Sequence, residues 1–201
     1  MPSTPFIVYA MPRSSSYWLS RFLAHNGRRR VEHEVAMTIR TPIADINWRV
    51  LSGLDGAVET AADQYWRLVR QLMPNARVVV LTRPIPEIVA SIAGLGISLD
   101  AFDWVKILRA QEARLQRIHH RVPNVLAVTY ADLRTEDGTR AVWDHCGNAR
   151  WDADWWARMA EQRLERSYNQ VHAYTALHWR EMQHANDLAQ RTMRQLIRAR
   201  L

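Results

Sequence analysis

The chain has 201 residues, of which 48% are hydrophobic and 23% are charged, so it can bury a sizeable core and is neither fibrous nor disordered. Its formal charge of +7 and pI near 10.3 favour an anionic ligand or partner, such as a nucleotide, a nucleic acid, a sulfated or phosphorylated substrate, or a membrane surface. A single cysteine excludes an internal disulfide, and neither a signal peptide nor an apolar run of membrane-spanning length is visible, so we expect a cytoplasmic protein without a membrane partner.

Residues 6–23 have the pattern of a strand, a loop and a helix. An apolar run of strand length ends before Pro12, and the basic, hydroxyl-rich turn from Arg13 to Ser16 precedes a helical pattern. Exposed amides at a helix start, with hydroxyls and a fixed positive charge, favour phosphate or sulfate. The Gly-Lys-Ser/Thr ending of a Walker A loop is missing, which argues against a P-loop kinase. The alternative is an ordinary connection whose serines cap the helix.

Further strands and helices alternate along the chain. The predicted strands are short and rich in apolar or β-branched residues, and they lie at 31–35, 49–51, 76–81 and 125–129. The predicted helices follow the helical period of apolar residues, and they lie at 58–73, 86–93 and 100–120. This alternation predicts an α/β fold in which helices flank a parallel β-sheet.

From about Asp152 the chain has a purely helical pattern. Asp152 or Asp154 can cap a helix, and a longer helix is expected at about 171–199. No domain boundary is evident, so residues 1–201 are expected to form one α/β domain with 152–201 as a helical C-terminal subregion. The long terminal helix would suit a homodimer.

Two predicted strands end in an arginine that is followed by serines. Arg13 precedes the three serines of the first loop, and Arg83 closes the strand at 76–81 with Ser91 eight residues later. Ligands of open parallel sheets bind at the carboxyl ends of the strands. If the helix after Arg83 folds back beside the strand end, Arg83 and Ser91 can reach one phosphate. A ligand with two separate anionic groups would suit the two loops.

Three segments resemble the markers of the sulfotransferases. Tyr-Ala-Met-Pro-Arg-Ser-Ser-Ser-Tyr-Trp-Leu at 9–19 resembles the family's 5′-phosphosulfate loop. The segment 78–92, with an apolar strand, an arginine and a serine eight residues later, is similar to its 3′-phosphate motif. Val-Thr-Tyr-Ala-Asp-Leu at 128–133 is similar to its third marker. Their order over residues 5–147 indicates a short, divergent relative with the P-loop NTPase-like fold of that family.

The resemblance implies the cofactor 3′-phosphoadenosine 5′-phosphosulfate (PAPS) and the product 3′-phosphoadenosine 5′-phosphate (PAP). A sulfuryl group would pass to a hydroxyl or amine of an unidentified small-molecule or glycan acceptor. Arg13 would bind the phosphosulfate and stabilise charge on the leaving oxygen, with fixed donors in place of a metal. The other cofactor-binding positions carried over from the family are Ser14, Ser15, Ser16 and Tyr17 in the loop, Trp18 near adenine, Arg83 and Ser91 on the 3′-phosphate, and Tyr130 near the nucleotide.

The sequence departs from the family pattern at several places. Ser15 stands where the loop has glycine, and Tyr17 stands where it has threonine. Pro-Ile-Pro-Glu at 84–87 replaces the usual Asp-Pro-Arg-Asp. The late Arg-Lys-Gly segment that closes over the nucleotide in cytosolic members has no counterpart in the sequence.

The general base is expected near the end of the strand at 31–35. Since strand residues alternate between faces, Glu32 and Glu34 should face one side and His33 the other. We prefer Glu34 as the base, with His33 second; the alternative is that Glu34 is a surface acid beside the cluster Arg28, Arg29 and Arg30. Asp55 and Glu59 flank a turn and could contact the acceptor, although capping of a helix is the favoured role.

A different class of function remains open from the sequence. A relative of the same fold that has lost catalysis could bind a nucleotide, or a basic protein could bind nucleic acid through Arg28 to Arg30 and the arginine-rich tail. Nucleic acid is the less favoured partner, because arginines at helical intervals beside apolar residues are typical of a packed helix.

Overall fold

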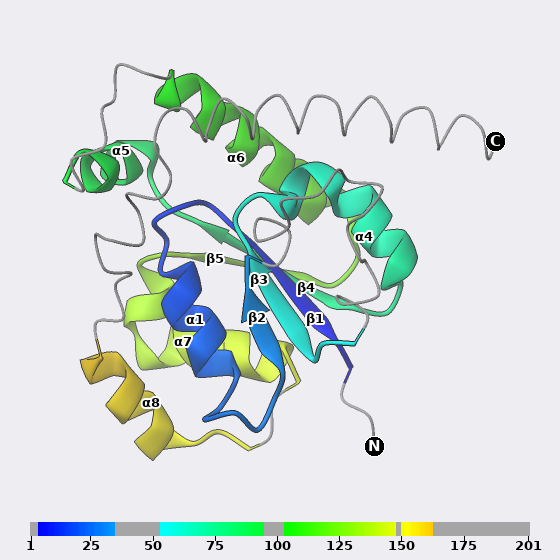
Figure 1. Ribbon diagram of the computed structural model, residues 1–201, viewed down its shortest axis with the longest axis vertical. Coiled ribbons are helices and arrows are strands. Elements are labelled where there is room, and N and C mark those ends of the chain that lie inside the picture. The colour runs from blue at the N-terminus through cyan, green and yellow to red at the C-terminus, as the bar shows by residue number, and fades with distance from the viewer. Residues whose placement is uncertain (1–3, 35–52, 95–102, 148–149, 163–201) are drawn as a thin grey trace.

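The computed structural model describes residues 4–34, 53–94, 103–147 and 150–162 (Figure 1). Five parallel strands form one sheet in the order β2-β3-β1-β4-β5. Their bounds are β1 Phe6–Ala10, β2 Val31–His33, β3 Gly56–Glu59, β4 Arg77–Thr82 and β5 Val125–Thr129. The predicted α/β class with a parallel sheet flanked by helices is therefore confirmed.

Helices cover both faces of this sheet (Figure 1). The α-helices are α1 Ser16–Leu23, α4 Trp66–Leu72, α5 Ile85–Ala93, α6 Trp104–Arg121, α7 Glu136–His145 and α8 Ala153–Glu161. Two 3-10 helices, η2 Ala62–Tyr65 and η3 Asp132–Arg134, complete the described elements. Among the described helices, none combines the length and the apolar character needed to cross a membrane.

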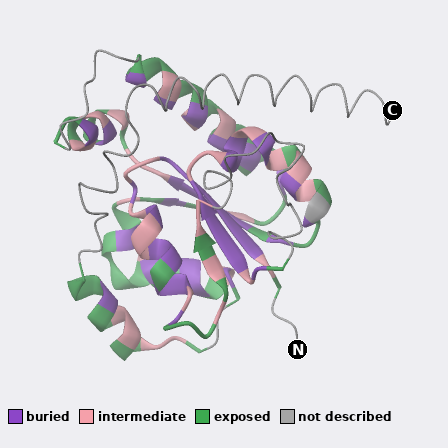
Figure 2. Cartoon of the chain, viewed as in Figure 1, coloured by how far each residue is buried: buried purple, intermediate pink, exposed green. Residues whose placement is uncertain are grey.

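The central strand β1 divides the core into two halves because its side chains alternate between the faces of the sheet. Ile7 and Tyr9 pack against α4, α5 and α6. Phe6, Val8 and Ala10 pack against α1, α7 and α8. All five residues of β1 are buried, as Figure 2 shows for the middle of the sheet. A strand that is apolar on both faces is thus explained by helices on both faces.

The third strand lies where the sequence analysis expected a turn and the start of a helix. Residues 58–59 belong to β3, and the expected helix at 58–73 is reduced to η2 and α4. The alanine and glutamate of this segment suit a helix, but pairing with β1 and β2 on both sides overrides that local preference. The expected strand at 49–51 lies outside the described residues.

The other predicted elements agree with the structure to within a few residues. The strands β1 and β5 have the expected bounds, and α5 and α6 overlap the helices expected at 86–93 and 100–120. Asp152 caps α8 by accepting a hydrogen bond from the amide of Trp155. Helix α7 was not among the predicted elements, and the helix expected at 171–199 lies outside the described residues. The single-domain organisation stays a prediction.

Candidate functional site

The loop between β1 and α1 bends without glycine. Arg13 has φ 59° and Ser15 has φ 63°, so two non-glycine residues adopt the left-handed conformation. Ser15 occupies the N-cap position of α1, yet its side chain makes no capping hydrogen bond. The alternative interpretation, in which serines simply cap the helix, is therefore wrong for Ser15. The hydroxyl of Ser14 is fully buried and donates to the carbonyl of Met11, so it stabilises the loop from inside.

The two arginines singled out from the sequence meet at the carboxyl edge of the sheet. The Nε of Arg13 donates to the Oγ of Ser91 over 3.0 Å, and Arg83 donates from Nη1 to the carbonyl oxygen of Arg13. Arg83 also lies over the ring of Tyr130, with 4.1 Å from Cζ to the ring centroid. Four of the expected cofactor-binding residues are thus in one cluster, in which Ser91, expected to share a phosphate with Arg83, accepts a hydrogen bond from Arg13.

One carboxylate lies beside this positive cluster. Glu87, on the first turn of α5, forms an ion pair with the Nε of Arg83 at 3.1 Å, and its side chain is half exposed. Two guanidinium groups held this close together offer the charged donors that suit an anion.

A second polar cluster joins the first helix to the end of β2. His33 lies 2.9 Å from the Oγ of Ser16 through Nε2 and 3.6 Å from the Oε2 of Glu34 through Nδ1. The ring of Tyr17 meets the imidazole edge-on at 5.5 Å. Thr60, just after β3, donates its hydroxyl to the Oε1 of Glu34 over 2.8 Å. Both candidates for the general base are consequently adjacent to the loop.

The expectation that only one of His33 and Glu34 could face the site is wrong. It assumed that strand alternation continues through residue 34, but β2 ends at His33 and Glu34 has φ 55°. This left-handed residue breaks the alternation, so the side chains of both residues contact each other. Glu32, which remains in the strand, is exposed.

Trp18 has a packing role in the structure. Its ring stacks on Phe22 at 5.1 Å with an interplanar angle of 4°, and its Nε1 donates to the carbonyl of Met159 in α8 over 2.7 Å. The indole is therefore directed toward α8 by contacts that the sequence analysis did not foresee. A contact between Trp18 and adenine stays a prediction.

The cluster Arg28 to Arg30 lies at the amino ends of β2 and β3, opposite to the loop with Arg13. The guanidinium of Arg29 donates to the carbonyls of Cys146 and Asp55, and the amide of Arg30 donates to the carboxylate of Asp55. Asp55 precedes β3, whereas Glu34 follows β2. Because the two strands are parallel, the arginines that contact Asp55 lie at the opposite end of the strand pair from Glu34. The idea that Glu34 is merely a surface acid beside them is wrong, because its side chain is 12% exposed and contacts His33 and Thr60. A contact between Asp55 and the acceptor stays a prediction.

Sequence reasoning missed a buried polar group beneath the candidate site. The amide nitrogen of Gln111 in α6 lies 3.3 Å from the carbonyl of Ala10, 2.6 Å from that of Thr60 and 3.2 Å from Oδ1 of Asp63. Asp63 also accepts a hydrogen bond from Arg114. A signal was present in the sequence, because Gln111 interrupts the apolar stripe of α6 between Leu108 and Leu115.

Burial raises the pKa of two titratable side chains in this region. Burial raises the pKa of Asp63, and this effect is larger than the lowering that the neighbouring Arg114 causes. Burial likewise raises the pKa of Tyr9 strongly, and the carboxylates of Glu59 and Asp63 add to the effect. Glu59 is 1% exposed and lies next to β1 in the sheet, so it is part of the interior and not of a helix cap.

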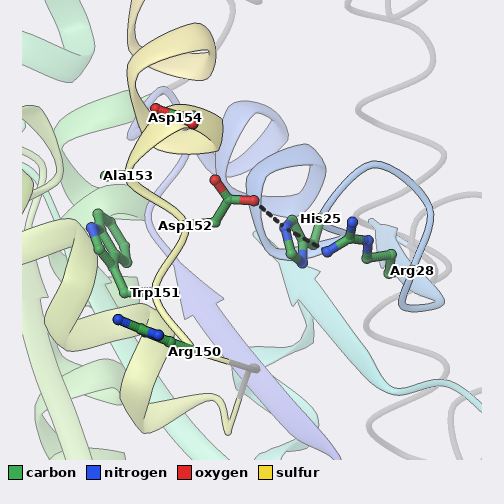
Figure 3. A pocket seen from close by; sticks show the side chains of 7 residues that line it. All are labelled: His25, Arg28, Arg150, Trp151, Asp152, Ala153 and Asp154. Carbon is green, nitrogen blue, oxygen red and sulfur yellow. Dashed lines mark hydrogen bonds and ion pairs between the residues drawn. The ribbon is translucent and has the colours of Figure 1, made fainter.

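A separate pocket of about 450 Å³ lies at the opposite end of α1 (Figure 3). The imidazole of His25 and the carboxylate of Asp152 form an ion pair across it at 3.0 Å, and Arg28 points toward the same imidazole. The loop with Arg13 precedes α1, whereas His25 follows it. This pocket is therefore distinct from the candidate site. No group of three or more potential metal ligands occurs within the described segments.

The sequence matches no protein-family model and no curated protein. The fold is similar to the crystal structure of sulfotransferase STF9 from Mycobacterium avium, with a TM-score of 0.55 and 12% sequence identity. The similarity covers 83% of this chain and 70% of that chain. At this identity the likeness concerns the fold. The protein therefore has a sulfotransferase-like α/β fold.

Proposed function

We propose that the protein is a sulfotransferase that transfers the sulfuryl group of PAPS to a hydroxyl or amine of a small-molecule or glycan acceptor. The observation that carries this proposal is the convergence of Arg13, Arg83 and Ser91 at the carboxyl edge of β1 and β4. Two adjacent guanidinium groups and a hydroxyl offer the donors that phosphate and sulfate oxygens require. The sulfotransferase-like fold is consistent with the same assignment.

The residues present fit this cofactor. Arg13 and the amides at the start of α1 would bind the phosphosulfate, while Arg83, Ser91 and Tyr130 would bind the 3′-phosphate and the nucleotide. The cofactor supplies an activated sulfuryl group, and fixed positive charge at Arg13 would stabilise the oxygen from which it departs. The Arg13–Ser91 and Arg83–Glu87 contacts must be exchanged for contacts to the ligand.

Glu34 is the proposed general base. It lies beside the loop, and its carboxylate is held by Thr60 and His33. A carboxylate in this position could take the proton of the acceptor hydroxyl as the new bond to sulfur forms. His33 is the second candidate, because its imidazole lies between Ser16 and Glu34.

The test of cofactor binding is calorimetric titration with PAP. Wild type should bind, and Arg83→Ala should bind at least about tenfold more weakly, because a charge-assisted contact to phosphate is lost. Arg117→Ala is the matched control: Arg117 is an exposed arginine of α6, two turns beyond Gln111 toward the amino edge of the sheet. It should bind like wild type. Absence of PAP binding by wild type would overturn the proposal.

The test of catalysis is transfer of radioactive sulfate from labelled PAPS to a panel of phenols, sugars and amines. Glu34→Gln should abolish turnover while leaving the Kd for PAP unchanged, since the substitution removes the base but retains the shape of the side chain. Turnover equal to that of wild type would exclude Glu34 as the base and move the assignment to His33. PAP binding without turnover of any acceptor would instead indicate a nucleotide-binding relative that has lost catalysis.

A further inference from the structure

Thr60 connects the proposed base to the sheet. It follows β3 directly, and its hydroxyl donates to the Oε1 of Glu34 over 2.8 Å. Glu34 itself follows β2 and has a left-handed backbone, so strand geometry alone does not aim its side chain. The contact with Thr60 is therefore one of the interactions that fix where the carboxylate lies.

Gln111 in turn connects Thr60 to the anion-binding loop. The side chain is 5% exposed, and its amide nitrogen lies within hydrogen-bond distance of the carbonyls of Ala10 and Thr60. Ala10 is the last residue of β1, from which the loop with Arg13 departs. One amide on α6 thus holds the ends of two neighbouring strands, one leading to the loop and one to Thr60.

The Gln111 side chain is itself fixed. Oδ1 of Asp63 accepts from the same amide at 3.2 Å, and the other oxygen of Asp63 accepts from Arg114, one turn further along α6. Asp63 is 2% exposed, so this arrangement is interior and not a solvated surface contact. Buried polar groups that satisfy one another in this way define a single arrangement of the elements that carry them.

We propose that Thr60 is a positioning residue for Glu34 and that Gln111 keeps the anion-binding loop and the base in register. The inference rests on the proposed function only for the role of Glu34 as base. Thr60 orients the carboxylate of Glu34. Gln111 fixes the distance between the end of β1 and the end of β3. Thr60 and Gln111 do not touch the reacting atoms in this scheme, so both act through other residues.

The first test compares Thr60→Val with Thr60→Ser. Valine keeps the shape of threonine but lacks the hydroxyl, whereas serine keeps the hydroxyl. Thr60→Val should lower kcat by about 10- to 100-fold, as expected for a misplaced catalytic group, with the Kd for PAP unchanged. Thr60→Ser should keep most of the wild-type kcat, because it retains the hydroxyl. Equal rates for Thr60→Val and wild type, or equal losses for valine and serine, would overturn the proposal.

A second measurement does not depend on activity. In protein labelled with 13C at glutamate carboxyls, the resonance of Glu34 is identified by its loss in Glu34→Gln. It should move in Thr60→Val and stay near its original position in Thr60→Ser. An unmoved resonance in Thr60→Val would refute the Thr60 contact even if the protein is an active sulfotransferase. A moved resonance in a protein without turnover would support the contact and count against the proposed function alone.

The role of Gln111 is tested by Gln111→Met against Gln116→Met. Both glutamines lie on α6, but Gln116 is exposed. Gln111→Met should weaken PAP binding and also move the Glu34 resonance, because the same amide holds both strand ends. Gln116→Met should change neither. If Gln111→Met leaves both unchanged, Gln111 does not couple the loop to the base.

Discussion

At the scale of single residues, the loop between β1 and α1 is shaped by conformations that its sequence does not favour. Arg13 and Ser15 both have positive φ, a region that costs a residue with a side chain roughly 1–2 kcal/mol. The buried hydroxyl of Ser14 and the hydrogen bond from Arg83 to the carbonyl of Arg13 hold the loop in this shape. The strain is located where the proposed anion would bind, as is common for functional loops.

Replacing Ser15 by glycine should relieve part of this strain. We expect Ser15→Gly to raise the free energy of unfolding by about 0.5–1 kcal/mol, because glycine adopts positive φ without a steric cost. Ser20→Gly is the control, since Ser20 lies inside α1 and glycine there should lower stability by about 0.5–1 kcal/mol. Urea unfolding measures both. A loss of stability in Ser15→Gly would show that the serine side chain contributes more than the strain costs.

At the scale of elements, β3 and α7 illustrate how contacts between segments decide local structure. Gly56 opens β3 because Phe6 of β1 packs over it: a Cβ there would lie 2.2 Å from the Cζ of Phe6. The end of α7 is held to the start of β4, where Arg77 donates to the carbonyls of Asp144 and His145. The imidazole of His145 also donates from Nε2 to the carbonyl of Val78 over 2.9 Å.

The His145 contact predicts a pH dependence of stability. Burial lowers the pKa of His145 below its ordinary value of 6.5. As the pH falls through 6.5, the unfolded chain binds a proton that the folded protein resists, so folding loses stability down to the folded pKa. We expect wild type to lose more stability than His145→Gln between pH 7.5 and 5.5, measured by urea unfolding at each pH. An equal loss in both proteins would mean that His145 titrates normally in the folded state.

At the scale of the whole molecule, α8 is attached along the length of α1. The indole of Trp18 donates to the carbonyl of Met159 at one end, and Trp155 donates to the carbonyl of Phe22 over 3.0 Å. At the other end the ion pair between His25 and Asp152 joins the turn after α1 to the cap of α8. Since α1 also carries the anion-binding loop at its start, α8 supports the site from behind.

The attachment of α8 can be weakened at one bond. Trp155→Phe should lower the free energy of unfolding by about 1–2 kcal/mol, because the hydrogen bond to Phe22 is lost while most of the apolar contact remains. Trp156→Phe, at the next residue of the same helix and partly buried against the same core, is the control for the smaller ring. Thermal or urea unfolding gives the difference between the two variants. Equal losses of unfolding free energy in the two variants would mean that the hydrogen bond of Trp155 does not stabilise the protein beyond the packing of its ring.

The α/β class and most of the strands and helices on which the site depends could be predicted from the pattern of residues alone. Apolar runs such as 6–10 and 125–129 are short and bounded by turn residues, so their period and length suffice. Arg13, Arg83 and Ser91 could also be predicted, because parallel strands present their carboxyl ends at one edge and the chain marks those ends with arginines. Tyr130 was predicted from the resemblance to sulfotransferases. The other features depend on local pattern and on one general rule of topology.

The position of β3, the contact between His33 and Glu34, and the buried group around Gln111 depend instead on packing between distant segments. The chain at 56–59 becomes a strand because two neighbours pair with it, a contact between segments that are distant in sequence. Glu34 turns toward His33 because its backbone leaves the strand in a left-handed conformation that no local pattern announces. Thr60 and Gln111 are separated by 51 positions, and their hydrogen bond exists only because the sheet brings β3 under α6. Periodicity describes one segment at a time, whereas these contacts arise from the packing of several segments together.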